Sequence, residues 1–308
     1  MRECPIPRCL RATLARIAHG TTQHMNRLVS TALATAAALA LVAGVAFAQA
    51  VKPHGDEIYT PQPGQTGKDV MWLGTPEAMV TAMLRAARTG PDDFVADLGA
   101  GDGRIAIAAA KEFGARSMGI EYEPKMAALA QRNAERAGVA GRVTIVHGDI
   151  FKEDFSRASV VTLYLLPELN LQLRPQILAM KPGTRVVSYT FTMGEWEPDE
   201  TIKGATFDAY RWTVPANVAG RWTLRDERDR MMGTVDLVQR FQKIAGTITL
   251  ANGAQQILGA FVDGNELGFS YVEPDGAFRA MRLRVDGERA GGSSRFDESA
   301  YTVSARRG

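Results

Sequence analysis

The chain has 308 residues, of which 45% are hydrophobic and 23% charged, and its formal net charge is +2. Residues 1–48 hold both cysteines, five of the 36 basic residues and one of the 34 acidic residues, which leaves 31 against 33. The remainder therefore lacks thiol chemistry and the basic runs that bind nucleic acid, and its two histidines, His54 and His147, are too few for a histidine metal cluster.

The N-terminal residues have the pattern of a targeting segment. Arg27 precedes an apolar run, Leu28–Ala48, that ends in Ala46-Phe47-Ala48. A positive start, an apolar centre and an A-x-A end are typical of a cleaved signal peptide, so we expect residues 1–48 to be removed. An uncleaved anchor is the alternative, and Met25 is a second candidate start. Either form predicts an exported protein, periplasmic or membrane-anchored and facing the periplasm, with no stable membrane partner once the leader is cleaved.

Residues 49–74 have many turn residues and little periodicity, so an extended lead-in is predicted. Thr75 as N-cap and Pro76 in the first turn then predict a helix. Short apolar strands alternate with helices up to residue 217. The candidate strands are Phe94–Asp97, Ser117–Glu121, Val143–Val146, Ser159–Leu165, Arg185–Phe191 and Phe207–Val214, and the later helices are Arg104–Phe113, Pro124–Ala137 and Pro167–Met180. This alternation predicts an α/β domain at 75–217, with a mostly parallel sheet covered on both faces.

Three alternating glycines follow the first strand, at Gly99, Gly101 and Gly103, and a helix begins at once. Glycine lets the backbone turn tightly and come close to a ligand, and the free N–H groups of the next helix point to the same place. The segment therefore predicts a nucleotide-type cofactor loop. An acidic residue, Glu121, ends the next strand, where it is placed to accept hydrogen bonds from ribose hydroxyls.

The spacing D-x-G-x-G-x-G, from Asp97 to Gly103, differs from the dinucleotide fingerprint G-x-G-x-x-G. It resembles the first motif of the class I S-adenosylmethionine (SAM) methyltransferases, which implies SAM as cofactor and a Rossmann-like fold. In that family an acidic residue after the third strand faces the adenine amino group, and Asp149 stands there. The cofactor-binding residues implied are Asp97, Gly99, Ala100, Gly101, Gly103, Glu121, Asp149 and Ile150.

A narrower resemblance covers Gly67 to about Val218. The segments Thr75-Pro76, Asp97–Arg104 and Val160–Leu169 are similar to small seven-strand protein-lysine methyltransferases, the group that modifies mitochondrial proteins such as a component of ATP synthase. Two further segments look like predicted exported bacterial methyltransferases, namely Gly67–Val70 and Thr190–Trp196. The resemblance implies a methyl acceptor such as a protein lysine amine.

The segment after the fourth strand is where this fold usually places substrate-facing residues. Tyr164 is expected to line the methyl channel, and Glu168 and Asn170 to accept hydrogen bonds from an amine. These three are the predicted catalytic residues. A structural interpretation stays open, because Pro167 and Glu168 also suit a helix start.

From residue 218 to 308 helical periodicity ends, and short strand-like runs are separated by turns such as Asn252-Gly253 and Asp286-Gly287. The pattern predicts a small antiparallel β-rich domain, a barrel or a sandwich, that packs on another surface or binds substrate or envelope. Two functions are therefore compared: an active methyltransferase, and a non-enzymatic envelope protein that retains the fold. The intact motif residues favour the first, and export away from cytosolic SAM favours the second.

Overall fold

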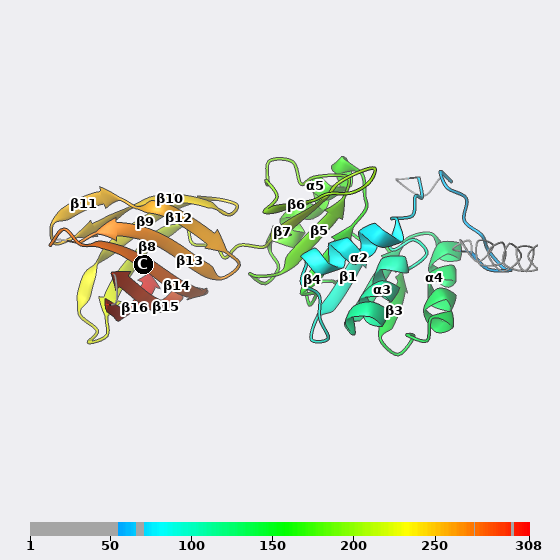
Figure 1. Cartoon of the computed structure of the whole chain (residues 1–308), viewed down its shortest axis with the longest axis horizontal. Coiled ribbons are helices and arrows are strands. Elements are labelled where there is room, and N and C mark those ends of the chain that lie inside the picture. Colours follow the sequence, from blue (N-terminus) through cyan, green and yellow to red (C-terminus); the bar gives the residue numbers. More distant parts are fainter. Residues whose placement is uncertain (1–54, 66–70, 274, 297–298) are drawn as a thin grey trace, which may run out of the picture. The chain divides into compact units, whose positions relative to one another are not determined.

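The structure, a computed structural model, describes residues 55–65, 71–273, 275–296 and 299–308 (Figure 1). The predicted leader, the first part of the lead-in and the segment Gly67–Val70 lie outside the described residues. Within the described ranges, no helix is long and apolar enough to cross a bilayer. Cleavage, anchoring and export therefore stay predictions.

Strands and helices alternate in the first part of the described chain, as the sequence predicts. The elements are α2 (Glu77–Ala86), β1 (Phe94–Leu98), α3 (Arg104–Phe113), β2 (Arg116–Glu121), α4 (Pro124–Arg136), β3 (Val143–His147), β4 (Val160–Leu163), α5 (Pro167–Leu178), β5 (Arg185–Tyr189), β6 (Glu200–Ile202) and β7 (Ala209–Thr213). They form one sheet in the order β3-β2-β1-β4-β5-β7-β6. The first five strands of that order run parallel, β7 pairs antiparallel with β5, and β6 pairs antiparallel with β7.

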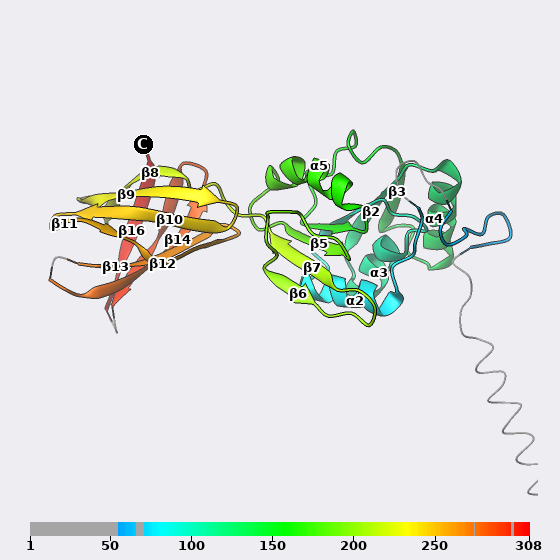
Figure 2. The same cartoon turned by 90° about the horizontal axis from the view of Figure 1, so that it is seen from above.

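Both faces of this sheet are buried. Neighbouring residues of one strand point to opposite faces, so each strand contributes to the core on both sides. Val95 of β1 packs in a cluster with residues of α2 and α3, whereas Ala96 packs in a cluster with Leu173 and Ile177 of α5. Figure 2 shows α5 on one side of the sheet and α2 and α3 on the other. The predicted α/β class is confirmed. The carboxyl ends of β1, β2, β3 and β4 meet at one edge, which is where ligands bind in such sheets.

Two local predictions in this part differ from the structure. The first helix has Pro76, not Thr75, as its N-cap residue, and no side chain caps it. The three-residue strand β6 was not predicted, since it is too short to show a pattern and forms by pairing with β7.

The tail is a second sheet of antiparallel strands. These are β8 (Gly220–Asp226), β9 (Met231–Arg240), β10 (Lys243–Leu250), β11 (Gly253–Gln256), β12 (Leu258–Asp263), β13 (Glu266–Val272), β14 (Phe278–Asp286), β15 (Arg289–Phe296) and β16 (Ser299–Arg307). Their order is β11-β10-β9-β8-β16-β15-β14-β13-β12. The predicted antiparallel tail is confirmed.

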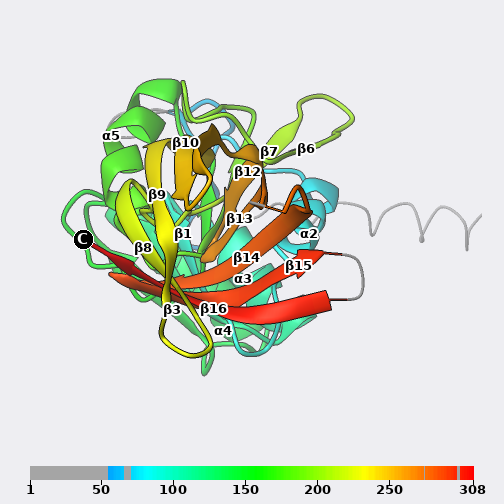
Figure 3. The same ribbon diagram turned by 90° about the vertical axis from the view of Figure 1, so that its left-hand side faces the viewer.

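This second sheet curls around its own core (Figure 3). Ile257 N, between β11 and β12, donates to Gly246 O of β10, so the two ends of the sheet approach one another. The tail is thus nearer to a barrel than to a sandwich. Because each of the two sheets has its own buried clusters, the boundary predicted at 217 and 218 stays a reasonable prediction.

Candidate active site

The glycine loop between β1 and α3 has the conformation that its sequence predicts. Gly101 and Gly103 have φ angles of +56° and +82°, in the left-handed region that side chains disfavour. A Cβ at Gly101 would lie 2.7 Å from Trp72 Nε1, and one at Gly103 would lie 3.0 Å from Ala130 Cβ. The loop therefore needs glycine for two reasons, its backbone angles and the closeness of its neighbours.

Asp97 is buried at the end of β1, with 2% of its surface exposed. Thr162 Oγ1 of β4 donates to its Oδ1 at 2.7 Å, while its Oδ2 has no hydrogen-bond partner among the described residues. Burial, with the nearby carboxylates of Asp102 and Glu121, raises the pKa of the Asp97 carboxyl to about 7. An unpaired buried oxygen of this kind is costly, and a cationic ligand group would satisfy it.

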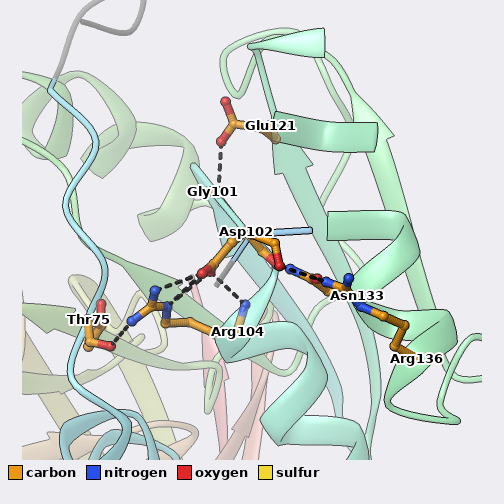
Figure 4. A network of polar contacts seen from close by, with 8 residues as sticks. Thr75, Gly101, Asp102, Arg104, Glu121, Asn133 and Arg136 are labelled. Carbon is orange, nitrogen blue, oxygen red and sulfur yellow. Dashed lines mark hydrogen bonds and ion pairs between the residues drawn. The ribbon is translucent and has the colours of Figure 1, made fainter. Parts of the chain in front are cut away.

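Two more carboxylates end the neighbouring strands. Glu121 Oε2 accepts from Gly101 N at 2.8 Å and its Oε1 from Glu123 N at 2.9 Å, so Glu121 lies directly beside the glycine loop (Figure 4). Burial raises the pKa of Glu121. Asp149 follows β3, where its Oδ1 accepts from Phe151 N at 3.1 Å. Strands β1, β2 and β3 thus each contribute one acidic side chain to the same edge.

These side chains surround one cavity of about 1020 Å³, its open mouth included. Among the predicted cofactor residues, the lining includes all but Gly103, namely Asp97, Gly99, Ala100, Gly101, Glu121, Asp149 and Ile150. The structure therefore brings together residues up to 53 positions apart in the sequence, from Asp97 to Ile150, and their binding roles stay predictions.

The predicted catalytic residues are not all at the cavity. Tyr164 lines it, and its ring meets Tyr189 edge-on with centroids 4.8 Å apart. Glu168 is exposed on the first turn of α5 and is not in the lining. Asn170 is fully buried away from it, and its Nδ2 donates to Ser188 Oγ and to the carbonyl oxygens of Phe191 and Thr192. The contacts of Asn170 hold the turn after β5.

Sequence reasoning missed one wall of the cavity. Residues 71–74 of the lead-in and the following Thr75 line it, as do Asp102 and Arg104 of the glycine loop and the start of α3. Tyr122, Glu123 and Phe151 also line it, and their positions directly after Glu121 and Asp149 were a usable signal. The lead-in offered none, because it has no periodicity.

Comparisons with known proteins show the family of the chain. Residues 97–200 match the model of the ANTKMT methyltransferase domain. A protein-lysine N-methyltransferase of Saccharolobus islandicus is 46% identical over 136 residues, which are 44% of this chain and 84% of that protein. The chain belongs to the class I SAM-dependent methyltransferase family.

Other proteins similar to this methyltransferase match over differing shares of their length. The adenine nucleotide translocase lysine N-methyltransferase of Mus musculus is 33% identical, over 47% of this chain and 63% of that protein. The crystal structure of an RNA methyltransferase from Salinibacter ruber with S-adenosyl-L-homocysteine is 47% identical, covering 47% of this chain and 96% of that one, with a TM-score of 0.47.

The cofactor of this methyltransferase is SAM. The site fits it, because the loop leaves no room for a Cβ at Gly101, and because Asp97, which lines the cavity, has an unpaired Oδ2 that an amino-acid ammonium would satisfy. The expectation of a non-enzymatic envelope protein finds no support in these relatives, which are methyltransferases by name.

Proposed function

We propose that this methyltransferase acts on the ε-amino group of a lysine side chain in a protein. The observation that carries the proposal is the 46% identity to the Saccharolobus islandicus protein-lysine N-methyltransferase over 84% of that protein. Further relatives named lysine N-methyltransferases, from Mus musculus and Homo sapiens, point to the same acceptor.

The acidic residues at the ends of β1, β2 and β3 bind different groups of the cofactor in this proposal. Asp97, with its unpaired Oδ2, would hold the ammonium of the methionine tail, Glu121 the ribose hydroxyls and Asp149 the adenine amino group; all three residues line the cavity. When bound, SAM supplies an electrophilic methyl group on a sulfonium. Most of the rate gain in such a displacement comes from positioning the nucleophile in line with that methyl group.

The part of the cavity beside Tyr164, where we place the methyl-accepting lysine, suits a neutral amine. Tyr164, Leu165 and Leu169 line it and form a mainly apolar wall. An amine buried against such a wall has a lowered pKa, because the charged form is disfavoured where water is excluded. The wall therefore helps lysine to lose its proton before it attacks.

The test compares acceptor classes directly. The purified protein is incubated with tritiated SAM and, in separate samples, with the envelope proteins and the RNA of the source cells. We expect label in protein, and methyl-lysine after acid hydrolysis and amino-acid analysis, with none in the Gly101→Arg variant. Label in RNA, or in protein on a residue other than lysine, would contradict the proposal.

We also propose that residues 1–48 direct export, which makes the acceptor an envelope protein. The support is the order of Arg27, the apolar run and Ala46-Phe47-Ala48. The full chain with a C-terminal epitope should be found in the periplasmic fraction with a new N-terminus after Ala48. Recovery in the cytosol with residues 1–48 intact would contradict this.

A further inference from the structure

The wall of the cavity formed by residues 71–75, here called the entry segment, is held in place by side chains of the glycine loop. The segment reads Met71-Trp72-Leu73-Gly74-Thr75, directly before α2, and all five residues line the cavity. It carries no acidic motif residue, and no helix or named strand explains its position.

Trp72 is the part of the entry segment that reaches the glycine loop. Its Nε1 lies 2.7 Å from where a Cβ of Gly101 would be, so the indole lies directly against that glycine. Its backbone is fixed as well, because Trp72 N donates to Gln65 O at 2.9 Å and Trp72 O accepts from Gly64 N at 2.9 Å. A ligand that approaches the Gly101 backbone therefore meets the indole.

Arg104 joins the entry segment to the loop (Figure 4). Its Nη1 donates to Thr75 O at 2.8 Å. Its Nε and Nη2 form a fork on Asp102, at 3.0 Å to Oδ1 and 2.7 Å to Oδ2. The guanidinium also lies 5.8 Å from the centroid of the Trp72 ring. One side chain thus contacts the entry segment at two points.

Asp102, the carboxylate that binds the Arg104 guanidinium, is buried. Asp102 is 2% exposed, and its backbone carbonyl accepts from Asn133 Nδ2 of α4 at 2.8 Å. A two-bond guanidinium–carboxylate pair is geometrically specific, and lysine cannot reproduce its fork. The planar contact leaves the third Arg104 nitrogen to bind Thr75 O.

We propose that Trp72 is a cofactor-contacting residue, and that Asp102 and Arg104 are positioning residues that hold it against the cofactor. The inference rests on the assignment of this cavity to SAM. The indole supplies apolar contact area over the Gly101 side of the cavity. The Asp102–Arg104 pair sets the distance between the entry segment and the loop.

Tryptophan fluorescence tests the contact, since the chain has four tryptophans and the other three are buried in hydrophobic cores. Trp196, Trp212 and Trp222 are at most 1% exposed and do not line the cavity, whereas Trp72 is partly exposed and does. We expect S-adenosyl-L-homocysteine to change the emission of the full chain saturably, with the Kd that calorimetry gives. Trp72→Phe should abolish the change and weaken the calorimetric Kd roughly tenfold.

The positioning role has its own variant and control. Arg104→Lys keeps the charge but loses the fork, so the emission of the free protein should shift to the red and the Kd should weaken roughly tenfold. Arg132→Lys is the control, because Arg132 pairs with Asp56 at 2.5 Å earlier in the lead-in and does not line the cavity. Its emission and Kd should match the wild type.

The outcomes separate this inference from the proposed function. Calorimetric binding to the wild type, with no change in emission and an unchanged Kd in Trp72→Phe, overturns the inference alone. An equal effect of Arg104→Lys and Arg132→Lys overturns the positioning role. No calorimetric binding to the folded wild type overturns both the inference and the cofactor site on which it rests.

Discussion

Both sheets bury polar side chains, but they differ in whether the carboxylate oxygens among them find partners within the protein. In the tail, the Tyr271 hydroxyl lies 3.0 Å from Ser294 Oγ and 2.9 Å from the Tyr301 hydroxyl. Tyr301 donates to Glu273 Oε1 at 2.5 Å, and Arg279 pairs with Glu273 at 2.8 Å. Both carboxylate oxygens of Glu273 therefore have partners within the tail.

The carboxyl edge of the first sheet does the opposite. Asp97 Oδ2 is the one buried carboxylate oxygen without a partner among the described residues, and Asp97 lines the cavity. A buried polar group that is left unpaired is destabilising, and a closed network is rigid and specific. We infer that the carboxyl edge of the first sheet needs a ligand to pair its buried carboxylate, whereas the cluster in the tail stabilises its own sheet.

The largest expected effect comes from filling the cofactor loop. Gly101→Arg places a side chain at φ +56° against Trp72 and into the cavity, so binding of SAM should fall by more than about 100-fold in calorimetry. Gly138→Arg is the matched control. Gly138 also has a positive φ, of +73°, but open space around its Cβ, so affinity should be kept. Unchanged affinity in Gly101→Arg would refute the placement of the site.

Removing the unpaired carboxylate should have the next largest effect. Asp97→Asn keeps the shape but removes the carboxylate that lines the cavity, so the Kd for S-adenosyl-L-homocysteine should weaken about 10- to 100-fold. Asp93→Asn is the control, because Asp93 lies before β1 at the other end of the strand and pairs with Arg185 at 2.7 Å. It should lower stability in denaturant unfolding without changing the Kd. Equal losses of affinity would contradict the ligand role of Asp97.

A pH titration sharpens the same point. The pKa of Asp97 is raised from 3.8 to about 7, so the free folded protein holds this proton below pH 7. A cationic ligand group favours the charged carboxylate, so binding releases the proton and affinity should rise roughly tenfold between about pH 6 and pH 8. Calorimetry in buffers of different ionisation enthalpy measures that proton. Asp97→Asn should make the profile flat, and a wild-type profile that is already flat would contradict the assignment.

The same pKa fixes the sign for stability. Between about pH 4 and pH 7 the unfolded chain has lost this proton and the folded protein has not. The contribution of Asp97 to stability of the ligand-free protein therefore falls as the pH rises through this window, and is constant above it. Denaturant unfolding of the wild type and of Asp97→Asn, compared across the window, isolates this contribution.

The sequence predicts those parts of the site that follow a strand. Asp97, Glu121 and Asp149 were predictable, because each lies at or just after the end of a short strand and parallel strands end at one edge. The entry segment was not predictable, because its position depends on contacts with Arg104, 29 residues away. Asn170 was assigned to the amine side from its place after β4, yet its position on α5 turns it toward Ser188 of β5.

In the tail, the sequence did not predict two strands, because their composition or length hides the alternation that is typical of strands. Strand β15 reads Arg-Ala-Gly-Gly-Ser-Ser-Arg-Phe, which has few residues that favour strands. It forms because β14 and β16 pair with it on both sides. Strand β11 is short and lies beside the predicted turn at Asn252-Gly253, which hid its pairing with β10. Neighbouring strands, not local preference, decide both elements.

The smallest expected effect on cofactor binding comes from a substitution in the polar cluster of the tail. Tyr301→Phe removes the hydroxyl that joins Tyr271 to Glu273, and leaves the aromatic ring in place. A partly buried hydrogen bond lost in this way costs about 1 to 2 kcal/mol in the free energy of unfolding, measured with denaturant. Calorimetry should give the wild-type Kd for S-adenosyl-L-homocysteine, because the cluster serves its own sheet. A weakened Kd at unchanged stability would mean that the tail contributes to the cofactor site, and the contrast between the two sheets would fail.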